Sequence, residues 1–214
     1  MGEVSKNDLF GSSIIKIIKE HSVSSMLEIG SWDGTGSTSC IIEAMSEMSS
    51  KSLTCLEIDN VKFNDLVNNT SRYDWIKCFN ESSISYESLI YKDFDKIWDS
   101  PFNNLPRHFN PKETVRGWFT RDVNNLKNTK IGFLERDKSF YEGVLIDGGE
   151  FTGYSEYSLV KDRTNFLFLD DFYHGFKTRQ IAVELFQSSE WECLAHDKDT
   201  RNGFIIFKRI NKSK

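Results

Sequence analysis

Several classes of protein are excluded by what the chain lacks. No apolar run approaches the roughly 18–20 residues of a membrane-spanning helix, and residues 1–10 contain no apolar signal core. Basic residues do not outnumber acidic ones, because 27 Lys and Arg stand against 32 Asp and Glu, a net charge of -5. Wholesale nucleic-acid binding needs a basic face. The sequence therefore predicts neither a membrane-spanning protein nor a nucleic-acid-binding one.

Cysteine and proline are also scarce. None of the four cysteines forms a C-x-x-C pair, which argues against a thiolate zinc site. We expect them to be reduced, in a cytoplasmic protein, because no secretion signal is found. Only three prolines occur and no tract is of low complexity, which argues against disorder. The 214 residues are therefore expected to form one domain, 1–214.

Short apolar strand patterns alternate with helix patterns along most of the chain. Strands are expected at 25–29, 52–56, 75–79, 141–146, 165–169, 191–195 and 203–208. Helices are expected at 11–20, 37–48, 61–68, 86–98, 153–161 and 177–186. Ser12 or Ser13 is expected to cap the first helix. Alternation of this kind predicts an α/β domain with a mostly parallel sheet, in which the last two strands pair as an antiparallel hairpin.

Residues 100–139 interrupt this alternation, before the fourth strand. The segment holds all three prolines and is rich in aromatic and basic residues, including Phe109, Trp118 and Arg121. Because about 40 residues is long for a loop, we expect an insertion that acts as a substrate flap. The alternative is a surface decoration that packs its own aromatic side chains.

A glycine-rich turn joins the first strand to the helix that follows it. Gly30, Gly34 and Gly36 allow the backbone to turn tightly and to approach a ligand closely. Three residues separate Gly30 from Gly34, so the pattern is not G-x-G-x-x-G, and no P-loop lysine follows it. The spacing disfavours a dinucleotide-binding protein.

Acidic residues directly follow several of the predicted strands. Glu57, Asp147, Asp170 and Asp171 stand at such positions. Ligands of parallel α/β sheets bind outside the carboxyl ends of the strands, where these side chains would gather. Glu57 can accept two hydrogen bonds from ribose hydroxyls there. Residues 80–82, after the third strand, supply polar groups where an adenine edge would lie.

Five short motifs in this order resemble the class I S-adenosylmethionine-dependent methyltransferases. Within that class the chain is most similar to the macrocin-type O-methyltransferases, which act on sugar hydroxyls. The motifs are Leu27-Glu28-Ile29-Gly30, Leu56-Glu57-Ile58-Asp59, Asn80-Glu81-Ser82, Leu145-Ile146-Asp147-Gly148-Gly149 and Leu169-Asp170-Asp171-Phe172. The resemblance covers roughly residues 23–98 and 140–208, and it implies a Rossmann-like methyltransferase sandwich with a seven-stranded sheet.

The resemblance implies a set of cofactor-binding residues for S-adenosyl-L-methionine. The turn at Gly30 would contact the methionine part, Glu57 would hold the ribose and Ser82 would lie near the adenine. The full expected set is Glu28, Gly30, Ser31, Trp32, Gly34, Thr35, Glu57, Ile58, Ser82 and Asp147.

The resemblance also implies a divalent cation, Mg²⁺ or Mn²⁺, held by Asp147, Asp170 and Asp171. Three converging carboxylates would repel one another unless a hard cation neutralised them. Such an ion could orient a sugar hydroxyl and lower its pKa. The alternative is that Asp170 caps a helix or pairs with Arg179.

The catalytic residues implied are Asp147 and a general base. Relatives commonly carry histidine or lysine three residues after the first acidic ligand, and here that residue is Glu150. A buried glutamate can act as a base, and His174 is the alternative because its ordinary pKa near 6.5 suits proton transfer.

The predicted function is O-methylation of a hydroxyl on a sugar or glycan, for example a deoxyhexose such as rhamnose. Trp118 or Phe109 could stack on the apolar face of the sugar ring. The alternatives are a methyltransferase for a non-sugar acceptor, a non-catalytic binding domain with a cofactor fold, and a nucleotide-sugar oxidoreductase. The chain could act as a homo-oligomer or as a module of a larger glycan-synthesis polypeptide.

Overall fold

The computed structural model describes residues 4–100, 110–173 and 176–210. It contains one seven-stranded sheet of order β3-β2-β1-β4-β5-β7-β6. The strands are β1 (Ser25–Ile29), β2 (Ser52–Leu56), β3 (Ile76–Phe79), β4 (Tyr141–Ile146), β5 (Thr164–Asp170), β6 (Trp191–Asp197) and β7 (Phe204–Arg209). Strands β1 to β5 run parallel, and β7 pairs antiparallel with both β5 and β6. The predicted mostly parallel sheet with an antiparallel C-terminal hairpin is confirmed.

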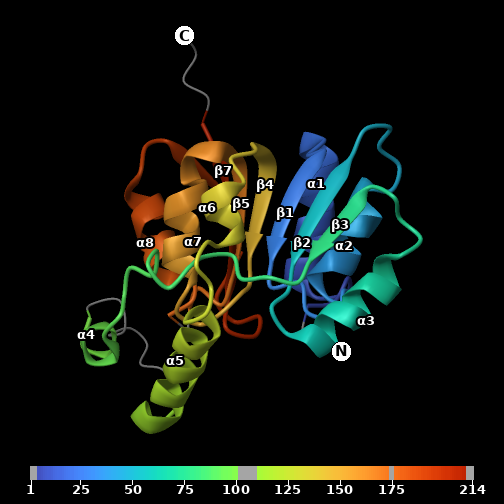
Figure 1. The fold of residues 1–214 in the computed structure, drawn as a ribbon. Helices are drawn as coiled ribbons and strands as arrows, with labels where there is room; N and C mark the ends of the chain where they lie inside the picture. The colour runs from blue at the N-terminus through green and yellow to red at the C-terminus, as the bar shows by residue number, and fades with distance from the viewer. Residues whose placement is uncertain (1–3, 101–109, 174–175, 211–214) are drawn as a thin grey trace.

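Helices cover both faces of this sheet (Figure 1). They are α1 (Leu9–His21), α2 (Ser37–Met45), α3 (Asn60–Thr70), α4 (Phe94–Trp98), α5 (Lys112–Leu126), α6 (Phe133–Arg136), α7 (Gly153–Val160) and α8 (Arg179–Gln187). A 3-10 turn, η2 (Lys161–Arg163), follows α7. None of the helices in the described ranges is long and apolar enough to cross a membrane.

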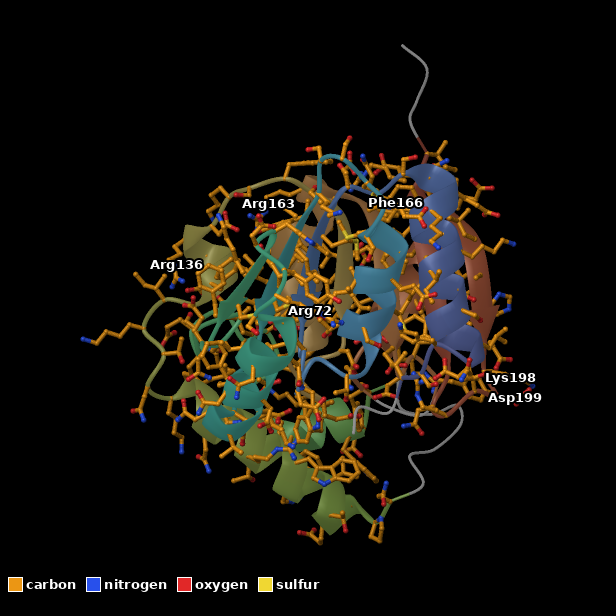
Figure 2. All side chains as sticks on the ribbon, turned by 90° about the vertical axis from the view of Figure 1, so that its right-hand side faces the viewer. Arg72, Arg136, Arg163, Phe166, Lys198 and Asp199 are labelled. Atoms are coloured by element: carbon orange, nitrogen blue, oxygen red, sulfur yellow. The ribbon has the colours of Figure 1, made fainter. Side chains whose placement is uncertain are left out.

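Each face of the sheet has its own apolar core. Side chains from α1, α2 and α3 pack on one face, where Phe10, Ile41 and Phe168 are fully buried. Figure 2 shows α1 and α2 side by side over that face. Side chains from α6, α7 and α8 pack on the other face, around Leu167 and Phe207. Strands buried on both faces explain why the sequence shows continuous apolar runs rather than alternation.

Helix α1 begins before the cap that was expected from the sequence. Asp8, not Ser12 or Ser13, is the N-cap residue, and its side chain accepts a hydrogen bond from the Gly11 N–H at 2.7 Å. The hydroxyls of Ser12 and Ser13 donate to the Leu9 carbonyl oxygen instead. The predicted cap was wrong because aspartate and serine are equally good N-cap residues, and the local pattern does not distinguish between them.

The helix predicted over 86–98 is mostly absent, because only Phe94–Trp98 is helical. Asp93 caps this short helix by accepting hydrogen bonds from the N–H groups of Asp95 and Lys96. Further upstream, the Glu135 carboxylate accepts hydrogen bonds from both the N–H and the hydroxyl of Ser85. This tertiary contact with α6 holds the chain between Ser85 and the short helix in a non-helical path.

The insertion carries two helices of its own, α5 and α6, beside residues that lie outside the described ranges. Helix α5 extends beyond the carboxyl ends of the parallel strands (Figure 1). Its Val115 and Phe119 pack against Phe94 and Phe151 in a small aromatic core, and Trp118 contacts the edge of that core. The aromatic side chains of α5 therefore anchor the helix to the domain.

Candidate functional site

A cavity of about 650 Å³ lies at the carboxyl ends of β1, β2, β4 and β5. This is within the range of about 300–1,000 Å³ typical of small-molecule sites. Its walls come from the glycine turn, the ends of β2 and β4, the segment after β3, helices α5 and α7, and the segment before α8. Lining residues include Gly30, Ser31, Trp32, Glu57, Ile58, Ser82, Ser83, Asp122, Asp147, Gly148, Glu156, Asp170, Asp171 and Lys177.

The glycine turn after β1 brings the backbone against the end of β4. Gly30 has φ +88°, and a Cβ at this position would overlap the carbonyl oxygen of Asp147. Only glycine tolerates both the positive φ and the close approach. The Asp147 N–H donates to the Ile29 carbonyl oxygen at 2.9 Å, which fixes the two strand ends together.

Glu57 joins the glycine turn to the end of β2. Its Oε2 accepts a hydrogen bond from the Trp32 N–H and its Oε1 accepts one from the Asp59 N–H, both at 2.8 Å. Burial raises the pKa of Glu57, against the opposing effect of these N–H groups. Each carboxylate oxygen keeps a further lone pair for a ligand hydroxyl. The geometry suits the ribose-binding role predicted from the sequence.

Three of the predicted cofactor-binding residues do not line the cavity. Glu28 is fully buried, and its carboxylate accepts hydrogen bonds from the hydroxyls of Ser37 and Thr38 at 2.6 Å each. Thr35 donates to the Asp33 carboxylate, and Gly34 packs against Leu66. These residues shape the turn from behind, while Gly30, Ser31 and Trp32 present it to the cavity.

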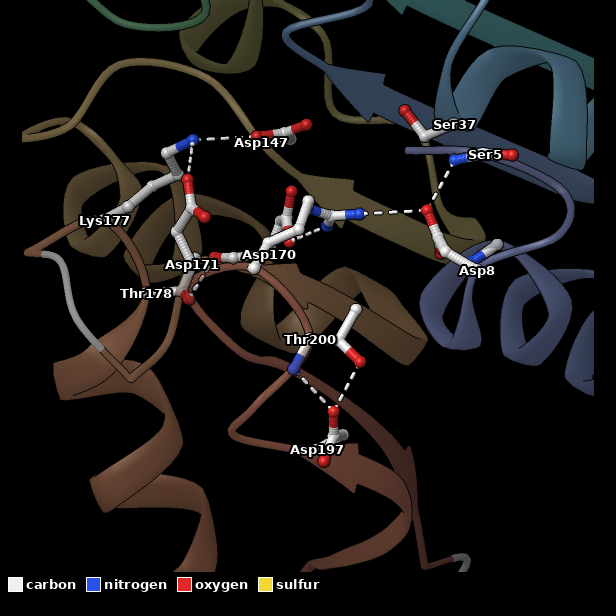
Figure 3. A network of polar contacts seen from close by, with 12 residues as sticks. Ser5, Asp8, Ser37, Asp147, Asp170, Asp171, Lys177, Thr178, Asp197 and Thr200 are labelled. Atoms are coloured by element: carbon white, nitrogen blue, oxygen red, sulfur yellow. Dashed lines mark hydrogen bonds and ion pairs between the residues drawn. The ribbon is translucent and has the colours of Figure 1, made fainter. Parts of the chain in front are cut away.

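Asp147, Asp170 and Asp171 form a tight acidic cluster. One carboxylate oxygen from each lies within 4.8 Å of the others. Figure 3 shows the Lys177 ammonium in contact with both Asp147 and Asp171. It lies 2.8 Å from Asp147 Oδ1 and 2.7 Å from Asp171 Oδ2. Although burial opposes the change, these carboxylates raise the pKa of Lys177 well above its ordinary value. The lysine is therefore a buried cation that neutralises part of the cluster.

Arg201 holds the third carboxylate of the cluster. Its guanidinium lies 2.5 Å from Asp170 Oδ1 and 3.2 Å from Asp8 Oδ2. Burial, together with the charge of Asp147, raises the pKa of Asp170 to about 8. The predicted alternative partner, Arg179, donates to the Tyr173 carbonyl oxygen instead. Asp170 therefore pairs with an arginine, but this is Arg201 of the β6–β7 hairpin and not Arg179.

The donor set of the cluster fits a divalent cation. Three carboxylates from two neighbouring strand ends offer the hard oxygen ligands that Mg²⁺ and Mn²⁺ prefer. Asp171 Oδ1 is buried and has no hydrogen-bond partner in the part of the chain that the structure describes. A cation bound there would compete with the Lys177 ammonium for the negative charge of Asp147 and Asp171.

Of the two predicted general bases, only Glu150 lies within the described residues. Glu150 Oε1 accepts a hydrogen bond from the Phe176 N–H at 2.7 Å, and Glu150 is not among the residues that line the cavity. His174 lies outside the described residues. Asp147, the third predicted catalytic residue, lines the cavity directly.

Two buried acids of the cavity wall were not predicted from the sequence. Asp122, on α5, accepts a hydrogen bond from the Phe151 N–H, and burial raises its pKa. Glu156, on α7, accepts a hydrogen bond from the Ser83 hydroxyl at 2.6 Å, and burial raises its pKa to about 7. Glu156 stands in the helix predicted at 153–161 and Asp122 in the predicted insertion, and a lone acid in either segment gives no signal of burial.

Replacing Glu156 with glutamine is expected to stabilise the protein at pH 8 but not at pH 5. The carboxyl ionises near pH 7 in the folded protein against 4.5 ordinarily, so the folded state binds more protons between these values. Stability is therefore lost as the pH rises through that window, by up to about 3 kcal/mol. The nearby charges of Asp122 and Lys177 remain in the variant.

Urea unfolding of both proteins at the two pH values measures this difference. The matched control is Glu87→Gln, whose side chain is largely exposed, and it should change stability little at either pH. A Glu156→Gln variant with the same stability difference at pH 5 and pH 8 would contradict a raised carboxyl pKa.

Comparison with known proteins shows the fold at low sequence identity. No family model and no curated protein matches the chain. Among solved structures, a putative caffeoyl-CoA O-methyltransferase from Staphylococcus aureus has 12% identity and a TM-score of 0.59, covering 95% of this chain and 84% of its own. The SAH-bound methyltransferase PaMTH1 from Podospora anserina has 11% identity and a TM-score of 0.57, covering 98% and 81%.

A third similar structure is an O-methyltransferase from Bacillus cereus in complex with SAH, with 10% identity and a TM-score of 0.55, covering 94% of this chain and 80% of its own. All three share the strand and helix arrangement described above. The fold of this chain is therefore that of the class I, Rossmann-like methyltransferases.

Proposed function

We propose that the protein is an S-adenosylmethionine-dependent O-methyltransferase that methylates a sugar hydroxyl. The observation that carries the proposal is that one cavity joins Glu57 to the acidic cluster. Glu57 offers acceptors suited to ribose hydroxyls, and the cluster lies across the turn at Gly30. A nucleoside held by Glu57 and extending over Gly30 would direct its other end toward Asp147.

S-adenosylmethionine supplies an electrophilic methyl group on its sulfonium. The residues of the chain then have to position an acceptor hydroxyl and take its proton as the new O–CH₃ bond forms and the S–CH₃ bond breaks. Asp147 lines the cavity and would act on that hydroxyl as a ligand of the cation. The candidate proton acceptors are the two that the sequence offered, Glu150 and His174.

Asp147, Asp170 and Asp171 would hold the proposed divalent cation, which would supply Lewis-acid activation of the hydroxyl. Until it binds, Lys177 and Arg201 provide the positive charge that holds the three carboxylates together. The closely spaced acceptors of this cluster suit neighbouring hydroxyls on a sugar ring. The second candidate function is methylation of a phenolic acceptor, which the shared fold with the putative caffeoyl-CoA O-methyltransferase from S. aureus favours.

Methyl transfer from radiolabelled S-adenosylmethionine to a panel of acceptors tests the proposal. We expect label in rhamnose-bearing glycosides, and loss of labelling when a chelator removes divalent cations. Label found only in catechols or caffeoyl esters would replace the sugar with the phenolic acceptor. Labelling that survives the chelator would remove the cation from the proposal but leave the transfer reaction.

A further inference from the structure

Glu156 is a buried carboxyl group with spare hydrogen-bonding capacity in the cavity wall. Its side chain comes from α7 and is 1% exposed. Oε1 accepts the hydrogen bond from Ser83, whereas Oε2 is buried and has no hydrogen-bond partner among the described residues. An unpaired buried carboxylate oxygen is costly, so its retention in a ligand cavity points to a ligand that completes it.

The end of β4 lies directly against this carboxyl. Gly148 follows Asp147 there, and a Cβ at residue 148 would lie 3.3 Å from Glu156 Oε1 and 3.7 Å from Oε2. Any larger side chain would stand against the carboxyl group. Because residue 148 is glycine, both it and Glu156 line the same cavity.

The polar side chains that directly follow β3 are committed to contacts with the protein itself. Glu81 forms an ion pair with Arg136. The Ser82 hydroxyl donates to the Ile84 carbonyl oxygen at 2.7 Å. The sequence analysis expected these residues to lie beside the adenine of the cofactor. In the structure, the hydroxyl of the next residue, Ser83, donates a hydrogen bond to Glu156.

We propose that Glu156 is the residue that recognises the adenine base of the cofactor, with Oε2 accepting a hydrogen bond from the exocyclic amino group. This inference rests on the proposed function, since it assumes that S-adenosylmethionine occupies the cavity. The amino group is the hydrogen-bond donor of the adenine ring, and a carboxylate is an acceptor only. A purine with a carbonyl oxygen at that position would place an acceptor against the carboxylate, and no hydrogen bond could form between the two.

The two neighbouring charges act on this carboxyl in opposite directions. Asp122 from α5 faces the carboxyl, and its charge disfavours ionisation of Glu156, whereas Lys177 favours it. At pH 8 the carboxyl, whose pKa burial raises to about 7, is mostly ionised and cannot donate to a carbonyl oxygen. Discrimination between an amino group and a carbonyl group is therefore greatest above neutral pH.

Calorimetric titration at pH 8 with two ligands tests the proposal without measuring activity. The ligands are S-adenosylhomocysteine and S-inosylhomocysteine, which differ in the amino or carbonyl group of the base. The wild type is expected to bind the adenine compound at least tenfold more tightly. In Glu156→Gln, whose amide both donates and accepts, this ratio should fall below threefold; Glu156→Leu should bind the adenine compound at least tenfold more weakly than the wild type.

Glu87→Gln is the matched control, because it makes the same change at an exposed glutamate that pairs with Lys92 and does not line the cavity, and it should keep the wild-type ratio. Wild type that binds both ligands equally, or a ratio unchanged in Glu156→Gln, would overturn the role of Glu156 while leaving cofactor binding intact. Wild type that binds neither ligand would overturn the proposed function and this inference with it.

Discussion

Replacing Lys177 with methionine is expected to destabilise the protein by about 3–5 kcal/mol when divalent cations are absent. The substitution removes the ammonium that lies within 2.8 Å of both Asp147 and Asp171 and leaves these two carboxylates buried without it. Removing one partner of a buried ion pair costs this much because the remaining charge stays desolvated. Urea unfolding in the presence of a chelator measures the loss.

The same variant should regain stability when Mn²⁺ or Mg²⁺ is added. Without the ammonium, a divalent cation meets no competitor for the oxygens of Asp147 and Asp171, and binding to the folded state alone stabilises it. We expect at least a tenfold higher affinity for Mn²⁺ than in the wild type, measured by the electron paramagnetic resonance of free Mn²⁺.

The control for this experiment is Lys92→Met. Lys92 pairs with Glu87 at 3.4 Å on the exposed surface, where such a pair contributes less than about 1 kcal/mol. It should neither lower stability appreciably nor respond to Mn²⁺. A Lys177→Met variant as stable as the wild type in chelator, or one that Mn²⁺ leaves unchanged, would argue against the cluster as a cation site.

Replacing Glu57 with glutamine is expected to weaken S-adenosylhomocysteine binding about 100-fold, since one or two charge-assisted hydrogen bonds to the ribose contribute about 1.5–3 kcal/mol each. The amide has one acceptor oxygen where the carboxylate has two. One of the two N–H groups now held by Glu57, from Trp32 or Asp59, would also lose its acceptor. Calorimetric titration measures the affinity.

Asp65→Asn provides the comparison, because Asp65 is an exposed acid on the neighbouring helix α3 and carries the same change in charge. Its affinity for S-adenosylhomocysteine should match that of the wild type. If Glu57→Gln retained affinity within threefold of the wild type, the ribose could not be held by Glu57, and the orientation of the cofactor in the cavity would have to be revised.

The sheet could be predicted from the sequence because its strands are buried on both faces. Segments such as 144–146 and 166–169 are apolar runs that an acid follows. The structure starts and ends the strands within a residue of the expected bounds, except that β6 ends at Asp197, two residues later than expected. The prediction of a helix at 86–98 was mostly wrong, because a contact distant in sequence decides the path of this segment. Its path is set by Ser85 bonding to Glu135, 50 residues away, which no local pattern reveals.

The acids of the site were predictable, but their partners were not. Asp147 and Asp170 follow apolar strands, and topology alone brings such strand ends together. Lys177 and Arg201 stand in loops whose positions depend on the packing of α8 and of the β6–β7 hairpin. Local sequence therefore located the negative charges of the cluster and left the positive charges that balance them to be found in the structure.

Asp8 has two roles in this fold. One of its carboxylate oxygens begins helix α1 by accepting from Gly11, and the other lies beside Arg201, which holds Asp170. The first turn of α1 and the acidic cluster are thus joined through Asp8 and Arg201. A substitution of Asp8 would therefore remove both the cap of α1 and a partner of the arginine that holds Asp170.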